Sequence, residues 1–135
     1  MGQSLRAVVR RGLPLSDEER TAVWSILGEF DVVDEIESYV PGGGGLNWES
    51  FHWSEPGDGV VFEGSSRLPD VTMSAMFKGI DHWGRMLGRL RSELFVDAEW
   101  SVDVEGDPIE WLVSEGRFWN RSFDSVDLES LDDLI

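Results

Sequence analysis

Two patterns of apolar and polar residues predict the first elements of the chain. Apolar residues alternate with polar ones through Ser4–Arg11, which predicts a first strand. In the segment that follows, Ser16 and Glu19 are three residues apart and form a capping-box pair ahead of an apolar stripe at 23–30. We therefore expect a helix that begins at Ser16.

The middle of the chain predicts a loop and then two strands. The sequence PGGGG at 41–45 is typical of a loop, because glycine and proline do not sustain regular structure. The segments 46–53 and 58–66 have strand composition and are joined by the turn-rich sequence SEPGDG.

A long helix is predicted over 68–95, because apolar residues recur there at helical spacing. A kink or break near Gly79 is compatible with the pattern, as is a strand at 71–77 with the helix starting at Asp81. The sequence GRMLG at 84–88 indicates close packing of this helix against the sheet.

The C-terminal third predicts a hairpin. Apolar residues alternate with polar, mostly acidic ones at 99–105, and on the other side of the turn EGDP the apolar residues Ile109, Trp111 and Val113 alternate with Glu110 and Leu112. A further strand is expected at 118–123. We interpret the tryptophans as core residues, with an exposed ligand platform as the alternative, because platforms that stack nucleic-acid bases combine aromatic with basic residues and the neighbours here are acidic.

Together these elements predict an α+β fold. We expect an antiparallel sheet with the ferredoxin-like order βαββαβ, an added C-terminal hairpin, and helices packed on one face. The domain boundaries are 1–123 for a single α+β domain and 124–135 for an acidic amphipathic tail.

The amino-acid composition limits the kinds of catalytic and metal sites that the chain can form. The 135 residues contain no cysteine and only two histidines, so we expect neither thiol catalysis nor a metal site, and no cofactor. The sequence has no phosphate-binding loop, dinucleotide fingerprint or nucleophile elbow. The best catalytic or metal constellation is Glu49, His52 and Glu55, although His52 and His82 are more typical of structural or surface residues.

The excess of acidic residues is the feature of the sequence that indicates most about possible binding partners. Eleven basic residues accompany 27 acidic ones, which gives a net charge of −16. Repulsion from phosphate argues against direct nucleic-acid binding and against anionic membranes. No segment resembles a signal peptide or a membrane span, so a cytoplasmic location is expected. The charge fits either solubility in a salt-rich cytoplasm or attraction of a basic protein partner.

The arginines fall into two groups, one at the N-terminus and one on the long helix. With so many acids present we expect internal salt bridges, with a small anion-binding patch as the alternative. The residues concerned are Arg6, Arg10, Arg11, Arg85, Arg89 and Arg91.

A small, acidic, tryptophan-rich α+β chain without a catalytic motif resembles, in general character, bacterial toxin-immunity proteins and phage-type inhibitors. This resemblance implies a module that occludes a basic surface of a partner protein. An enzymatic or small-molecule-binding domain, with a pocket between sheet and helices, and a halophilic housekeeping domain are the alternatives. The partner-binding residues expected from the hairpin and the tail are Asp103, Glu105, Asp107, Glu110, Asp127, Glu129, Leu131, Asp132, Asp133 and Leu134.

Overall fold

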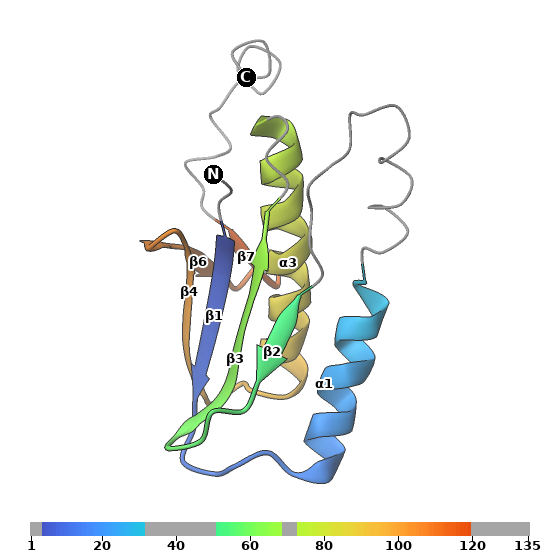
Figure 1. The fold of residues 1–135 in the computed structure, drawn as a ribbon, viewed down its shortest axis with the longest axis vertical. Helices are drawn as coiled ribbons and strands as arrows, with labels where there is room; N and C mark the ends of the chain where they lie inside the picture. The colour runs from blue at the N-terminus through green and yellow to red at the C-terminus, as the bar shows by residue number, and fades with distance from the viewer. Residues whose placement is uncertain (1–3, 32–50, 69–72, 120–135) are drawn as a thin grey trace.

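The structure is a computed structural model that describes residues 4–31, 51–68 and 73–119, with the side chains of 73–75 left aside. Over these residues the chain has an α+β fold with two helices, a five-stranded antiparallel sheet and a separate two-stranded ribbon (Figure 1). The elements are β1 (Ser4–Arg10), α1 (Asp17–Glu29), β2 (His52–Ser54), β3 (Val60–Arg67), α3 (Met73–Glu93), β4 (Glu99–Val104), β5 (Asp107–Pro108), β6 (Glu110–Leu112) and β7 (Arg117–Trp119).

The strand order in the main sheet is β2-β3-β1-β4-β5, and every neighbouring pair is antiparallel. It follows that β1 and β2 run parallel with β3 between them, and that β3 and β4 run parallel with β1 between them. Each helix therefore lies in the connection between two parallel strands that are separated by a third strand.

The predicted alternation of β1 is confirmed. Leu5, Ala7 and Val9 are fully buried and join a core cluster that contains residues of both helices. The residues between them face the opposite side of the sheet, where Arg6 and Arg10 are exposed. One face of the sheet thus carries the core and both helices.

The capping box that opens α1 is also confirmed. The backbone N–H of Glu19 donates to the Ser16 hydroxyl at 3.1 Å, and the backbone N–H of Ser16 donates to the Glu19 carboxylate at 2.9 Å. Val23, Ile26 and Leu27 form the buried face of this helix.

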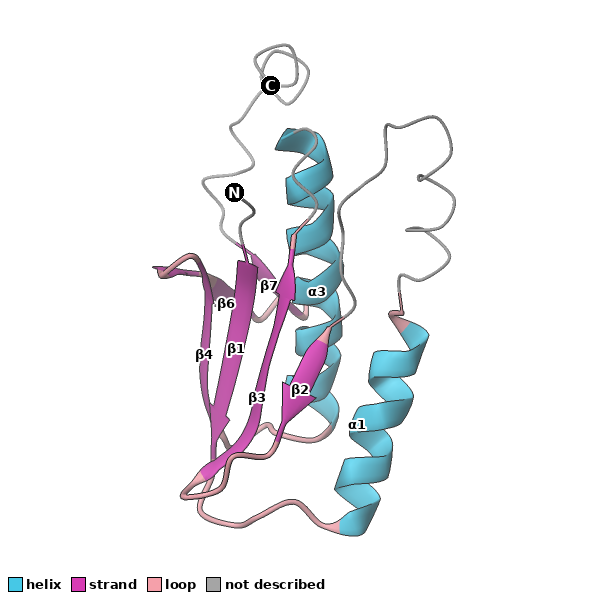
Figure 2. Ribbon diagram, in the orientation of Figure 1, coloured by secondary structure: helices cyan, strands magenta, loops and turns pink. Residues whose placement is uncertain are grey.

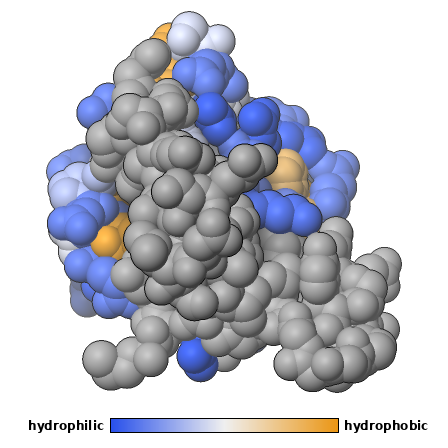
Figure 3. Space-filling model, turned by 90° about the horizontal axis from the view of Figure 1, so that it is seen from above, coloured by the Kyte–Doolittle hydropathy of each residue, from blue (hydrophilic) through white to orange (hydrophobic). Residues whose placement is uncertain are grey.

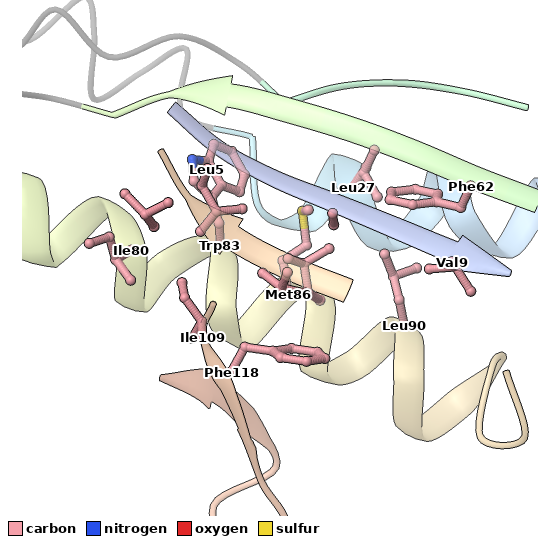
Figure 4. Packing of buried hydrophobic residues seen from close by; sticks show 14 of the residues in the cluster. Leu5, Val9, Leu27, Phe62, Ile80, Trp83, Met86, Leu90, Ile109 and Phe118 are labelled. Carbon is pink, nitrogen blue, oxygen red and sulfur yellow. The ribbon is translucent and has the colours of Figure 1, made fainter. Parts of the chain in front are cut away.

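The long helix is continuous. It spans Met73–Glu93 and passes Gly79 without a break, so the alternative of a strand at 71–77 is wrong over 73–77. Its buried side contributes Ile80, Trp83, Met86 and Leu90 to the core, opposite Leu5, Val9 and Phe62 of the sheet and Leu27 of α1 (Figure 4).

Another side of α3 contacts the ribbon formed by β6 and β7. A side chain at Gly88 would overlap the carbonyl oxygen of Gly116, and one at Gly84 would overlap the carbonyl oxygen of Phe118. The sequence GRMLG is therefore a close-packing motif, as predicted, although the partner is the ribbon.

The C-terminal hairpin differs from the expectation. Of the expected second arm, only the two residues of β5 pair with β4, and Ile109 adds one more hydrogen bond by donating its N–H to the Val102 carbonyl at 2.8 Å. Pro108 has no N–H to donate to a ladder, and the chain then pairs β6 with β7 in a separate sheet. The alternation expected at 109–113 also fails, because Leu112 is buried and Val113 is 79% exposed.

Candidate functional site

The acids expected to bind a partner from the hairpin lie around the β4–β5 turn. Glu105 and Gly106 both have positive φ, 51° and 88°, which is the backbone of a type I′ turn. The Asp103 carboxylate accepts a hydrogen bond from Gly106 N–H at 3.1 Å, and the Glu105 carboxylate accepts one from Ser4 N–H at 2.7 Å. Two of the four acids therefore fix the turn and its contact with β1.

These acids do not share one face. Asp107 is opposite Val104 in the pairing of β4 with β5, whereas Asp103 is opposite Pro108. Directly opposed residues point to the same side of a sheet, so Asp107 and Asp103 point to opposite sides. Asp107 and Glu110 are exposed. The expected tail residues, Asp127, Glu129, Leu131, Asp132, Asp133 and Leu134, lie outside the described residues.

The described residues do not form the catalytic or metal site that the sequence suggested around His52. His52 is exposed on β2, while the Glu55 carboxylate accepts hydrogen bonds from Arg20 on α1. Glu49 lies outside the described residues. His82 has a structural contact, with its Nε2 2.6 Å from the carbonyl oxygen of Phe30 at the end of α1. Within the described ranges no group of three or more acidic or histidine residues is placed to hold a metal ion.

Most of the arginines form internal ion pairs, as the sequence predicted. Arg89 joins Glu29 of α1 to Glu93 of its own helix. The other described pairs are Arg6–Glu63, Arg11–Glu19, Arg20–Asp17, Arg20–Glu55, Arg85–Asp81, Arg117–Asp81 and Arg117–Glu115.

Arg91 is in none of these ion pairs and packs against the ribbon instead. Its guanidinium lies 4.9 Å from the centre of the Trp111 ring, and burial lowers the pKa of Arg91. Of the arginines that the sequence singled out, Arg6, Arg11, Arg85 and Arg89 thus form internal ion pairs, Arg91 packs on the ribbon, and Arg10 is exposed.

Three connections meet at one end of the sheet, which we call the loop end: residues 11–16, 55–59 and 94–98. In Figure 2 these connections lie together at the end opposite to the β4–β5 turn. Three neighbouring hollows at the loop end share Arg11 and Gly12 in their walls, and the largest is a groove of about 910 Å³ between 11–16 and 94–98.

Arg11 organises the loop end. Its guanidinium donates to the carbonyl oxygens of Leu13 and Pro14 at 3.0 and 3.1 Å and to the Glu19 carboxylate at 2.6 and 2.9 Å. It also lies 5.5 Å from the centre of the Phe95 ring, which ties 11–16 to 94–98. The Arg11 hydrogen bond, together with the Ser16 backbone N–H, lowers the pKa of Glu19 to about 2.

This arrangement presents two apolar side chains to solvent on either side of the groove. Leu13 is 73% exposed and Val96 is 62% exposed, and both line the groove. Among the exposed acids, Asp97 lines the groove, and Asp58 and Glu99 line a neighbouring hollow together with Arg10 and Asp97. Asp17 and Glu18 directly follow Ser16, which also lines the groove. An apolar centre with a charged rim is the arrangement found in many protein–protein interfaces.

Figure 3 views the molecule from the end opposite to the loop end. The described residues that are visible in this view are mostly hydrophilic, with small separate hydrophobic areas. Neither described helix has the length and apolar character needed to span a bilayer.

Sequence reasoning missed the loop end as a site. The available signal was that Leu13 and Val96 are apolar residues outside any helical or strand period. Their proximity depends on the fold, because 83 positions separate them along the chain.

Comparisons of the chain with family models, with curated proteins and with solved structures find no match. The candidate site therefore rests on its geometry and charge.

Proposed function

We propose that this chain is a small acidic protein-binding module that occludes a basic surface of a partner protein, in the manner of toxin-immunity proteins and phage-type inhibitors. The observation that carries the proposal is the exposure of Leu13 and Val96 together, beside a groove with acidic side chains around it. Exposed apolar groups supply affinity when a partner covers them, and the acids around them select a basic partner.

The net charge of −16 supports the same proposal. A field of one sign accelerates association with an oppositely charged protein, and salt weakens this effect. The net charge already includes the arginines that pair within the chain, so the acids in excess over the basic residues set the sign of that field. Direct binding of nucleic acid or of an anionic membrane is not part of the proposal, since both would be repelled.

The loop end replaces the hairpin as the centre of the proposed interface. Asp103 and Glu105 are engaged in the β4–β5 turn, whereas Asp58 and Asp97 are exposed beside the groove. Asp107 and Glu110 remain available for a peripheral contact.

The ferredoxin-like assignment also stands as a proposal. The two pairs of parallel strands, each separated by one intervening strand, support it. The alternative of a ligand pocket between sheet and helices receives less support, because large side chains such as Phe62, Trp83 and Leu90 fill that space.

The test is affinity capture with the purified chain from a lysate of its source cells, followed by identification of retained proteins. The wild type and three variants would be compared at roughly 0.1 M and 1 M salt, because raising the salt concentration over this range screens most of the attraction between exposed charges. These are the wild type, Leu13→Ser with Val96→Ser, the same double change with Asp97→Asn, and Val113→Ser as a matched control. Val113 is 79% exposed but lies in the β6–β7 connection, away from the groove.

We expect the wild type and Val113→Ser to retain the same basic protein at low salt. The double variant should bind it roughly 30-fold or more weakly, because a covered Leu or Val contributes about 1–2 kcal/mol each. Retention that is equal for the wild type and the double variant would place the interface elsewhere, and a retained protein that is acidic would contradict the charge argument.

A further inference from the structure

Trp24 is the tryptophan with an exposed side chain among those that the structure describes. It lies on α1 and is 61% exposed, whereas Trp83 and Trp119 are buried and Trp53, Trp100 and Trp111 pack against the core. Exposed tryptophan is a frequent centre of binding energy in protein interfaces, because its large ring loses much water contact when covered.

The indole of Trp24 is held in place. Its ring centre lies 5.3 Å from that of Trp53, with the planes at 63°, and Trp53 stacks at 5.3 Å on Phe62, which is fully buried. One turn earlier on α1, Arg20 pairs with Glu55 at the end of β2 and fixes the helix to the strand. A partner would therefore meet a preorganised ring and would not have to order it.

The position of Trp24 is continuous with the loop end. Glu55 and Asp58 line the hollow between residues 11–15 and the β2–β3 turn. Glu55 also pairs with Arg20, which lies one turn before Trp24 on α1. Asp17 and Glu18 lie between Leu13 and Trp24 in the chain, and Arg20 pairs with both Asp17 and Glu55. Three carboxylates, of Asp17, Glu18 and Glu55, therefore accompany one guanidinium near Trp24, and this part of the surface keeps a net negative charge.

We infer that Trp24 takes an arginine side chain of the basic partner by stacking, as a second contact beyond the groove; this inference rests on the proposed function. A guanidinium is planar, is weakly hydrated and stacks on indole, and the same plane can donate hydrogen bonds to a neighbouring carboxylate. The chain makes this kind of contact internally, with Arg117 4.8 Å from the Trp119 ring centre and Arg91 4.9 Å from that of Trp111.

The test uses synthetic peptides of alternating arginine and leucine, with lysine–leucine peptides of equal length for comparison. Binding is followed by the indole N–H signals in NMR, where Trp24→Phe identifies the signal of Trp24, and by calorimetry. We expect the arginine peptide to shift the Trp24 signal. Its affinity should fall about two- to thirty-fold in Trp24→Ala, which is the range of a cation–aromatic contact. Trp24→Phe should retain most of it.

The lysine peptide should bind more weakly than the arginine peptide and should lose less in Trp24→Ala. An arginine peptide that binds wild type and Trp24→Ala equally, that leaves the indole signal unmoved, or that fails to bind the wild type would overturn the inference. Thermal unfolding of each variant checks that the fold is kept.

The two proposals fail separately. If binding is lost in Leu13→Ser with Val96→Ser but is unchanged in Trp24→Ala, the groove stands and the role of Trp24 is refuted. If binding is weakened by Trp24→Ala and unaffected by the groove variant, Trp24 is an arginine contact and the groove is not the interface.

Discussion

Replacing Gly88 with Ala should destabilise the protein, although alanine is the better helix former. On helix propensity alone the change would stabilise α3 by about 1 kcal/mol. The added methyl group, however, would overlap the carbonyl oxygen of Gly116 and lie 2.9 Å from the Cα of Arg117. Both are backbone atoms of the ribbon, so no side-chain rotation relieves the overlap.

The ribbon must therefore move away from α3, which loosens the packing of buried Phe118 and Leu112. Overpacking of this kind costs about 1–3 kcal/mol, and the partial loss of two buried side chains adds about 1–2 kcal/mol. Set against the gain in propensity, the free energy of unfolding should fall by about 1–4 kcal/mol.

The matched control is Gly28→Ala in α1, where an added methyl group meets no atom within 4 Å. This change should leave stability unaltered or raise it by up to about 1 kcal/mol. Urea unfolding followed by tryptophan fluorescence measures the free-energy change of both variants. In thermal unfolding, Tm should fall by roughly 3–14 °C for Gly88→Ala only. If Gly88→Ala is as stable as Gly28→Ala, the ribbon does not pack on α3 as described.

Two further predictions concern the start of α1. Ser16→Ala removes the hydroxyl that accepts from Glu19 N–H and should cost about 1 kcal/mol of stability in urea unfolding, while Ser25→Ala on the exposed side of the same helix should cost little. Glu19 has a folded pKa of about 2 against an ordinary 4.5, so its contribution is present above pH 4.5 and is lost as the pH falls toward 2. In Glu19→Gln the loss of Tm between pH 4.5 and pH 2 should be smaller than in the wild type, and an unchanged pH profile would show that the Arg11–Glu19 pair is not formed in solution.

The elements with strong local signals were predictable from the sequence. Alternation in β1 identified the buried residues Leu5, Ala7 and Val9, because successive side chains of an extended strand point to opposite faces. The Ser16–Glu19 spacing identified the start of α1, because a capping box joins near neighbours in the chain. The two glycines of GRMLG were also correctly assigned to close packing.

The path of the chain after Pro108 could not be read from alternation. The apolar residues at 109–113 fit a period of two, but pairing with β7 and packing on α3 bury Leu112 and leave Val113 exposed. Which strands pair is decided by tertiary contacts, and period-two patterning does not specify them.

The loop end and the exposure of Trp24 were also beyond sequence reasoning. Trp24 fits the apolar stripe of α1, but its ring covers Trp53 at the sheet edge and does not enter the core. Leu13 and Val96 are apolar residues outside any helical or strand period, but the sequence does not show that they lie near each other, which depends on the two distant connections that Arg11 joins.

The most direct test of the proposed interface is site-specific photo-crosslinking in a lysate of the source cells, with a benzophenone side chain placed in turn at positions 13, 96, 107 and 113. If the loop end is the interface, one basic protein should be crosslinked from positions 13 and 96, with the yield reduced at high salt, and no such product should form from position 113. Crosslinking from position 107 or 113 alone, with none from 13 or 96, would contradict it.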